Sequence, residues 1–101
     1  MSATIVRTDD QNAEVRGDLL NSTVVPVLEQ GRKLLAAAGG QWTVSLAAVD
    51  KVSSAGVALL LEWMREAEKQ SVTLRIADLP EHMRPIISIS DLDPVFETVL
   101  I

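Results

Sequence analysis

The most constraining feature of the chain is a strand-like segment that leads directly into a helix-like one. Residues 42–48 form an apolar run rich in β-forming side chains, and Asp50-Lys51 interrupts it. Ser53-Ser54 then precedes a long series of strong helix formers with apolar residues at helical spacing. This order predicts a strand, a turn at Asp50-Lys51 and a helix that begins near Ser54.

The start of this predicted helix consists of very small residues. We expect Ser54 to be the N-cap, because its hydroxyl can accept a hydrogen bond from an early helix amide, a contact worth about 1 kcal/mol. Ala55 and Gly56 then form a first turn with almost no side chain. Such a turn lets another backbone or an anion approach the positive end of the helix. The alternative is purely structural: Ser54 caps the helix, and the small residues allow tight packing.

The faces of this helix are distinguished by their side chains. Apolar residues at helical spacing predict a buried stripe of Val57, Leu60, Leu61, Met64 and Ala67. Charged residues mark the solvated side, namely Glu62, Arg65, Glu66 and Lys69. Leu59 and Trp63 stack four residues apart at the border. They form either the margin of a wide core stripe or an exposed docking patch beside Ser54, since exposed apolar residues of this size usually need a partner to cover them.

The N-terminal forty residues predict a hairpin and a helix. Residues 4–7 and 11–16 have β-type patterns, and the Asp9-Asp10 pair between them is typical of a turn. A helix is predicted from Ser22-Thr23, which can cap it, to the glycine pair Gly39-Gly40, which ends it.

The C-terminal part predicts one more strand and short helical pieces. Residues 72–77 are expected to join the central sheet as a parallel strand through a right-handed crossover. A helical segment after Asp78 is expected to be short or kinked by Pro85, and residues 95–101 to pack as a short strand or helical turn. The prediction is a single α/β domain over residues 1–101, with a mixed β-sheet of about four to five strands packed with three to four helices.

Composition narrows the function. The chain has 101 residues and a net charge of −5, with both signs spread along it, which argues against nucleic acid as a partner. It has no cysteine, no signal-peptide pattern and no apolar run long enough for a membrane span, so we expect a cytoplasmic chain that does not insert into the membrane.

The sequence offers little for catalysis. Ser54 as a nucleophile would need a base within hydrogen-bond reach, and the one histidine, His82, lies in a different segment outside any Gly-x-Ser-x-Gly motif. Asp18 and Asp50 are the carboxylates expected closest to Ser54, and solvation of the sheet edge explains both equally well. We expect no metal, no cofactor and no enzymatic activity.

Three segments together resemble a STAS domain, the fold named after sulfate transporters and anti-sigma-factor antagonists. They are Val52 to Leu61, Gly17-Asp18-Leu19 with the helix start that follows it, and Ile76 to Pro80. The resemblance covers nearly the whole chain. Within the family, the Ala-Gly after Ser54 and the Leu-Leu-Leu-Glu-Trp segment are most similar to the MlaB-type subunit of the Mla ABC system.

This resemblance implies a binding role without catalysis. Proteins of the MlaB type dock on the ATPase subunit of an ABC transporter, in complex with its permease, and support ATPase assembly and activity. That transporter moves phospholipids between inner and outer membranes and maintains outer-membrane lipid asymmetry, so the chain would be peripheral to the inner membrane through its partner. The residue aligned with Ser54 lies at the ATPase contact. The resemblance thus implies that Ser54 binds the partner. Its neighbours are our own additional candidates for partner contacts, namely Ser53, Ala55, Gly56, Leu59 and Trp63.

An alternative implied by the resemblance is an anti-sigma-factor antagonist in which a kinase phosphorylates Ser54. Phosphate would add about −1.5 to −2 charges at the contact. Such antagonists usually carry Asp immediately before the phosphorylated serine, where this chain has Ser53, although Asp18 matches the acidic position at a strand end. A third class, a lipid or small-molecule carrier, would need a pocket in a core that is normally filled at this size.

Overall fold

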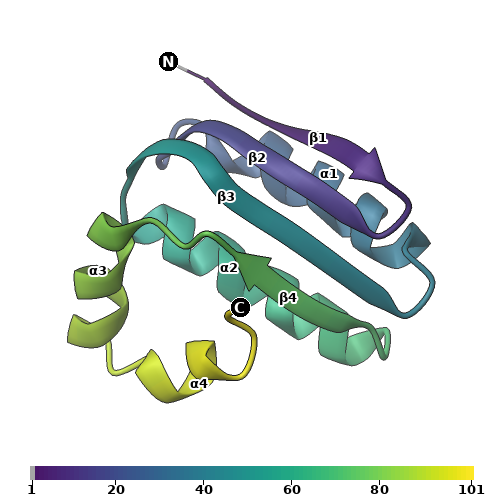
Figure 1. The fold of residues 1–101 in the computed structure, drawn as a ribbon. Coiled ribbons are helices and arrows are strands. Elements are labelled where there is room, and N and C mark those ends of the chain that lie inside the picture. Colours follow the sequence, from purple (N-terminus) through teal and green to yellow (C-terminus); the bar gives the residue numbers. More distant parts are fainter. Residues whose placement is uncertain (1) are drawn as a thin grey trace.

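A four-stranded sheet forms the centre of the protein, and two long helices cover one of its faces (Figure 1). The computed structural model describes residues 2–101. The elements in chain order are β1 (Ala3–Asp9), β2 (Asn12–Leu19), α1 (Val24–Ala37), β3 (Gln41–Val52), α2 (Ser54–Lys69), β4 (Thr73–Ala77), the 3₁₀ helix η1 (Glu81–Met83), α3 (Arg84–Ile89) and α4 (Asp93–Glu97).

The sheet is mixed, as the sequence predicts, with the strand order β1-β2-β3-β4. β1 and β2 form an antiparallel hairpin, whereas β2 with β3 and β3 with β4 are parallel. The parallel pairs are joined by α1 and α2, which both return across the same face of the sheet (Figure 1). Leu100 pairs with Ile76, so the C-terminal segment runs beside part of the outer edge of β4.

The core lies between the sheet and the two long helices, and the contact of α1 with α2 depends on Gly31. A Cβ atom at Gly31 would lie 2.2 Å from Cζ2 of Trp63, so the indole occupies the space that a side chain would need. The Trp63 ring meets Trp42 edge to face, with centroids 5.3 Å apart. Its Nε1 donates a hydrogen bond to the Leu28 carbonyl at 3.2 Å. Trp63 therefore ties α1, α2 and the sheet together.

The interpretation of Leu59 and Trp63 as an exposed docking patch is wrong, and the wide core stripe is correct. Leu59 is 2 % exposed and Trp63 is 0 % exposed. Because α2 packs against α1 as well as the sheet, its buried face turns toward these two residues. Leu61 and Met64, which we expected in the stripe, are only half buried.

The predicted turn at Asp50-Lys51 is also wrong, because β3 continues through both residues to Val52. The Lys51 amide donates to Oδ1 of Asp18 at 3.1 Å, and the Ser53 amide donates to the Leu19 carbonyl at 3.0 Å. These bonds to the end of β2 extend the strand beyond its apolar run.

Most other boundaries agree with the sequence. Thr23 immediately precedes α1, and Gly39 and Gly40 follow its end with φ values of 74° and 109°. Pro85 lies in the first turn of α3, which is short as expected. The tail forms a helix and then the single bridge to β4. Within residues 2–101, no helix combines the length and apolar character required to span a bilayer.

Candidate functional site

The candidate site is the start of α2, where the sequence places Ser54. The N-cap is Ser53 and not Ser54: Ser53 has extended backbone angles, and its Oγ accepts a hydrogen bond from the Ala55 amide at 3.1 Å. Ser54 is the first helical residue, and its side chain is exposed. The capping role therefore belongs to Ser53, which leaves the Ser54 hydroxyl available to solvent.

Gly56 serves internal packing rather than access from outside. It is buried, and a Cβ atom there would lie 3.1 Å from Cβ of Leu19 and 3.2 Å from Cε of Met83. The first turn of α2 thus sits directly on the end of β2 and on η1. For Gly56 the structural reading of the small residues is the correct one, while Ala55 remains half exposed.

A groove opens beside Ser54 between the starts of α1 and α2. We call it the α1–α2 groove; it has a volume of about 370 Å³. It is lined by Asn21, Val24, Leu28, Ser54, Ala55, Ala58, Leu59 and Glu62. Leu59 forms part of its floor although it is almost fully buried, and Glu62 is the one charged residue of the lining. Val25, next to the groove along α1, is 62 % exposed, so apolar surface continues outside the groove.

Arg32 fixes the far end of this groove by connecting the two helices. Its guanidinium pairs with Glu29 of α1 at 2.8 Å and with Glu62 and Glu66 of α2 at 3.4 and 3.9 Å. Glu62 also pairs with Arg65 at 3.3 Å. The two helices that form the groove are therefore joined by the ion pairs of Arg32 as well as by the packing of Trp63.

Asp18 bonds to the backbone segments that lead into the site. It is 8 % exposed, and its carboxylate accepts the Lys51 amide hydrogen bond at the end of β3. Its backbone carbonyl accepts a hydrogen bond from the Thr23 hydroxyl, just before α1. Asp18 thus organises the strand ends from which α1 and α2 both begin.

The one histidine of the chain, His82, is bonded to β3. Nε2 of His82 lies 2.6 Å from the Asp50 carbonyl oxygen and donates to it, which ties η1 to β3. Within residues 2–101, the Ser54 side chain forms no hydrogen bond. Across the same residues, no three His, Cys, Asp or Glu side chains cluster in a way that could hold a metal ion.

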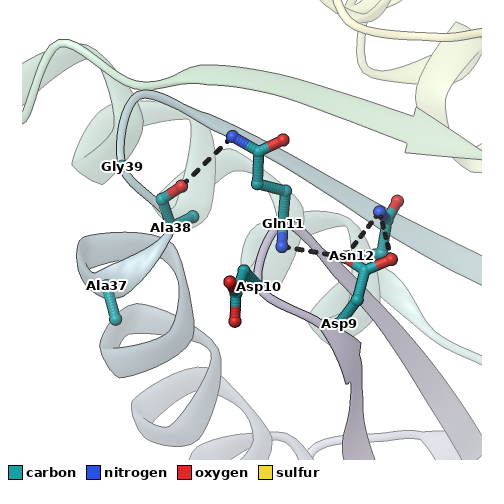
Figure 2. A pocket seen from close by; sticks show the side chains of 7 residues that line it. All are labelled: Asp9, Asp10, Gln11, Asn12, Ala37, Ala38 and Gly39. Carbon is teal, nitrogen blue, oxygen red and sulfur yellow. Dashed lines mark hydrogen bonds between the residues drawn. The ribbon is translucent and has the colours of Figure 1, made fainter.

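A larger hollow, of about 920 Å³, lies elsewhere, between the β1–β2 turn and the end of α1 (Figure 2). Its polar groups bond to one another: Asp9 accepts from the Asn12 side chain and the Gln11 amide, and Gln11 Nε2 donates to the Ala38 carbonyl. The bonds that Asp9 accepts, above all the one from the Asn12 side chain and then the one from the Gln11 amide, lower the pKa of Asp9 below its usual value. The polar groups of this hollow thus stabilise the hairpin turn, and we assign it no binding role.

The sequence reasoning missed the α1 side of the groove. Asn21, Val24 and Leu28 are about thirty residues from Ser54 in the chain, and Ala58 shows no functional pattern. The apolar residues near the start of α1 can be read from the sequence, but such residues usually indicate a buried core and not the lining of a groove. Only the crossing of α1 and α2 brings these residues together.

The fold is a two-layer α/β domain with an open groove beside Ser54. The sequence profile of the family described as "Mlab, STAS domain" matches residues 6–100, so the chain belongs to this STAS-domain family. STAS domains are in general binding domains. A comparison with curated protein sequences finds no match.

Two solved structures show the same fold. The chain is similar to the anti-sigma factor antagonist SpoIIAA in its unphosphorylated form, with a TM-score of 0.65, 18% identity and coverage of 86% of this chain and 82% of that one. It is also similar to a sulfate transporter family protein from Wolinella succinogenes, with a TM-score of 0.67, 14% identity and coverage of 94% and 79%. At these identities the likeness concerns the fold.

Proposed function

We propose that the chain is a non-catalytic STAS subunit that binds the ATPase of an ABC transporter moving phospholipids between the inner and outer membranes. Its binding would support assembly and activity of the ATPase and hold the chain at the inner membrane. The family match, whose description names MlaB, supports this choice of partner.

The observation that carries the proposal is the position of Ser54. Its exposed hydroxyl lies on the rim of an apolar groove between α1 and α2. A concave apolar surface between two helices, beside exposed Val25, suits a partner helix with an apolar face. Ser54, Ala55 and Ala58 would contact the partner directly, with Leu59 beneath them. Trp63 has no exposed surface, so its contribution would be to hold the groove in shape.

Co-expression with the ATPase tests this proposal. We expect the chain to co-purify with the ATPase, and Ser54→Arg to abolish the complex because a long cation blocks the groove. Gln70→Arg is the matched control: it adds the same charge to exposed surface at the other end of α2, about 24 Å away. Loss of binding by both variants, or by neither, would contradict the proposed interface. Thermal unfolding of each variant checks that the fold is intact.

A second candidate is an anti-sigma-factor antagonist regulated by phosphorylation of Ser54. The exposure of this hydroxyl favours it, together with the fold shared with SpoIIAA. A phosphate at this helix start would add about −1.5 to −2 charges directly on the groove and would alter any contact made there. Ser53 makes the site less like that of an antagonist, as it stands in the usual place of Asp. Ser54→Asp would mimic the modified state and release the partner, with Ser54→Ala retaining it.

A further inference from the structure

The outer edge of β1 is open. Among residues 2–101, β1 pairs with β2 on one side and with no other strand, whereas the opposite edge of the sheet is partly covered by the bridge of Ile76 to Leu100 (Figure 1). The ladder with β2 is regular from Ala3 to Arg7, and its register shifts after that. The backbone of residues 3–7 therefore presents a regular row of groups to which another strand can bond.

A groove follows this edge between β1 and α1, and we call it the edge groove. It has a volume of about 310 Å³ and is lined by Ile5 and Arg7 of β1 and by Gln30, Lys33 and Leu34 of α1. Ile5 and Leu34 are half buried and supply its apolar surface. The edge groove and the α1–α2 groove share no lining residue.

The charge of the edge groove is the opposite of that of the chain. Both charged residues of its lining are cations, although the net charge of the chain is −5. Arg7 is held by the hairpin turn, since it pairs with Asp10 and donates to the Asp9 carbonyl. Lys33 is exposed and forms no ion pair with any of residues 2–101. Lys33 is thus the cation free to attract an acidic ligand.

We propose that this edge binds an extended, acidic segment of another protein as an added strand. Its backbone would pair with residues 3–7 of β1, over a length of about 17 Å. An apolar side chain would enter the edge groove against Ile5 and Leu34, and a neighbouring carboxylate would meet Lys33. Strand addition of this kind derives affinity from backbone bonds and specificity from pockets for alternate side chains.

The charge pattern disfavours a second copy of the chain as the occupant. Antiparallel self-pairing over the full strand is centred on Val6 and sets Arg7 of each copy opposite Ile5 of the other. In that register, Arg7 of the second copy would lie beside Arg7 and Lys33 of the first. Three cations at this distance repel one another, and like charges opposite each other destabilise a strand pair. An acidic segment brings no further cation to the edge groove.

NMR titration with designed peptides tests the proposal, independently of the function assigned to Ser54. The probes are acetylated heptapeptides of the pattern Thr-Glu-Thr-Ile-Thr-Val-Thr, with Val, Ile or Leu at the apolar positions and Asp or Glu at the acidic one. We expect amide shift changes in residues 3–7 and 30–34. Lys33→Glu should weaken binding by about fivefold, and a peptide with Lys in place of Glu should recover it. Lys69→Glu, the same change at the end of α2, should leave the affinity unchanged.

Methylation of alternate peptide amides should abolish binding, because it removes the backbone bonds that an added strand needs. Three results would each overturn the proposal: no shifts at about 1 mM of any of these peptides, shifts centred on the α1–α2 groove, or equal affinity for acidic and basic peptides. A dimer detected by light scattering at the same protein concentration, with residues 3–7 at its interface, would also overturn it.

Discussion

Replacing Gly31 with alanine tests the packing that shapes the α1–α2 groove. In an ordinary helix interior, Gly→Ala stabilises by about 1 kcal/mol, because it restricts the unfolded chain. At Gly31 the added Cβ would lie 2.2 Å from Cζ2, 2.4 Å from Cε2 and 2.6 Å from Nε1 of Trp63. The indole has to move, and it is fully buried against Trp42.

The magnitude follows from the contacts that this movement disturbs. Overpacking a filled core costs about 1 to 3 kcal/mol. Loss of the Trp63 hydrogen bond to the Leu28 carbonyl adds about 1 kcal/mol. After subtracting the helix-propensity gain, we expect Gly31→Ala to lower the free energy of unfolding by about 1 to 3 kcal/mol. The melting temperature would fall by about 4 to 8 °C for each kcal/mol.

The assay is urea denaturation followed by tryptophan fluorescence. Gln30→Ala, at the exposed neighbouring position, is the control and should change stability by less than about 0.5 kcal/mol. In a Trp63→Phe background the smaller ring should relieve the clash, so that Gly31→Ala becomes neutral or stabilising. A Gly31→Ala protein more stable than the wild type would refute the proposed packing.

Three further measurements test other parts of the account. Ser53→Ala should cost about 1 kcal/mol of unfolding free energy, whereas Ser54→Ala should cost almost nothing; equal losses would contradict the assignment of the cap. Trp63→Ala should lower the free energy of unfolding by about 3 to 5 kcal/mol, because it truncates a buried aromatic side chain. A loss near zero would contradict the burial of Trp63. The pKa of Asp9 measured by NMR should lie below its usual value and should rise in Asn12→Ala, because the Asn12 side chain is the main cause of the lowering. Since this pKa is lowered on folding, the stabilisation exists above the unfolded pKa of about 4 and is lost as the pH falls through the folded value, so unchanged stability on acidification would argue against it.

Elements with local signals could be predicted from the sequence. The Gly39-Gly40 pair ends α1, and both residues have positive φ. The predicted hairpin forms, although its turn lies at Asp10-Gln11 because Asp9 is still the last residue of β1 and pairs with Asn12. Ser53 and Ser54 differ by one position, and either can cap a helix. Their roles were decided by the backbone path out of β3, which no local pattern encodes.

Features that depend on two distant segments could not be predicted. β3 extends through Asp50 and Lys51 because the end of β2 offers it hydrogen-bond partners. Trp63 is buried because a glycine in the middle of α1 leaves space for it, and Gly31 within a helical pattern was the one available signal. The groove beside Ser54 likewise exists only where α1 and α2 cross.

The most direct test of the central claim is to recover the partners of this chain from its native host, with wild-type, Ser54→Arg and Gln70→Arg proteins tagged identically. Mass spectrometry of the wild-type and Gln70→Arg samples should identify an ABC ATPase with its permease, and the Ser54→Arg sample should lack both. Recovery of a kinase or an anti-sigma factor in their place would contradict the transporter assignment and make Ser54 the site of a phosphorylation switch.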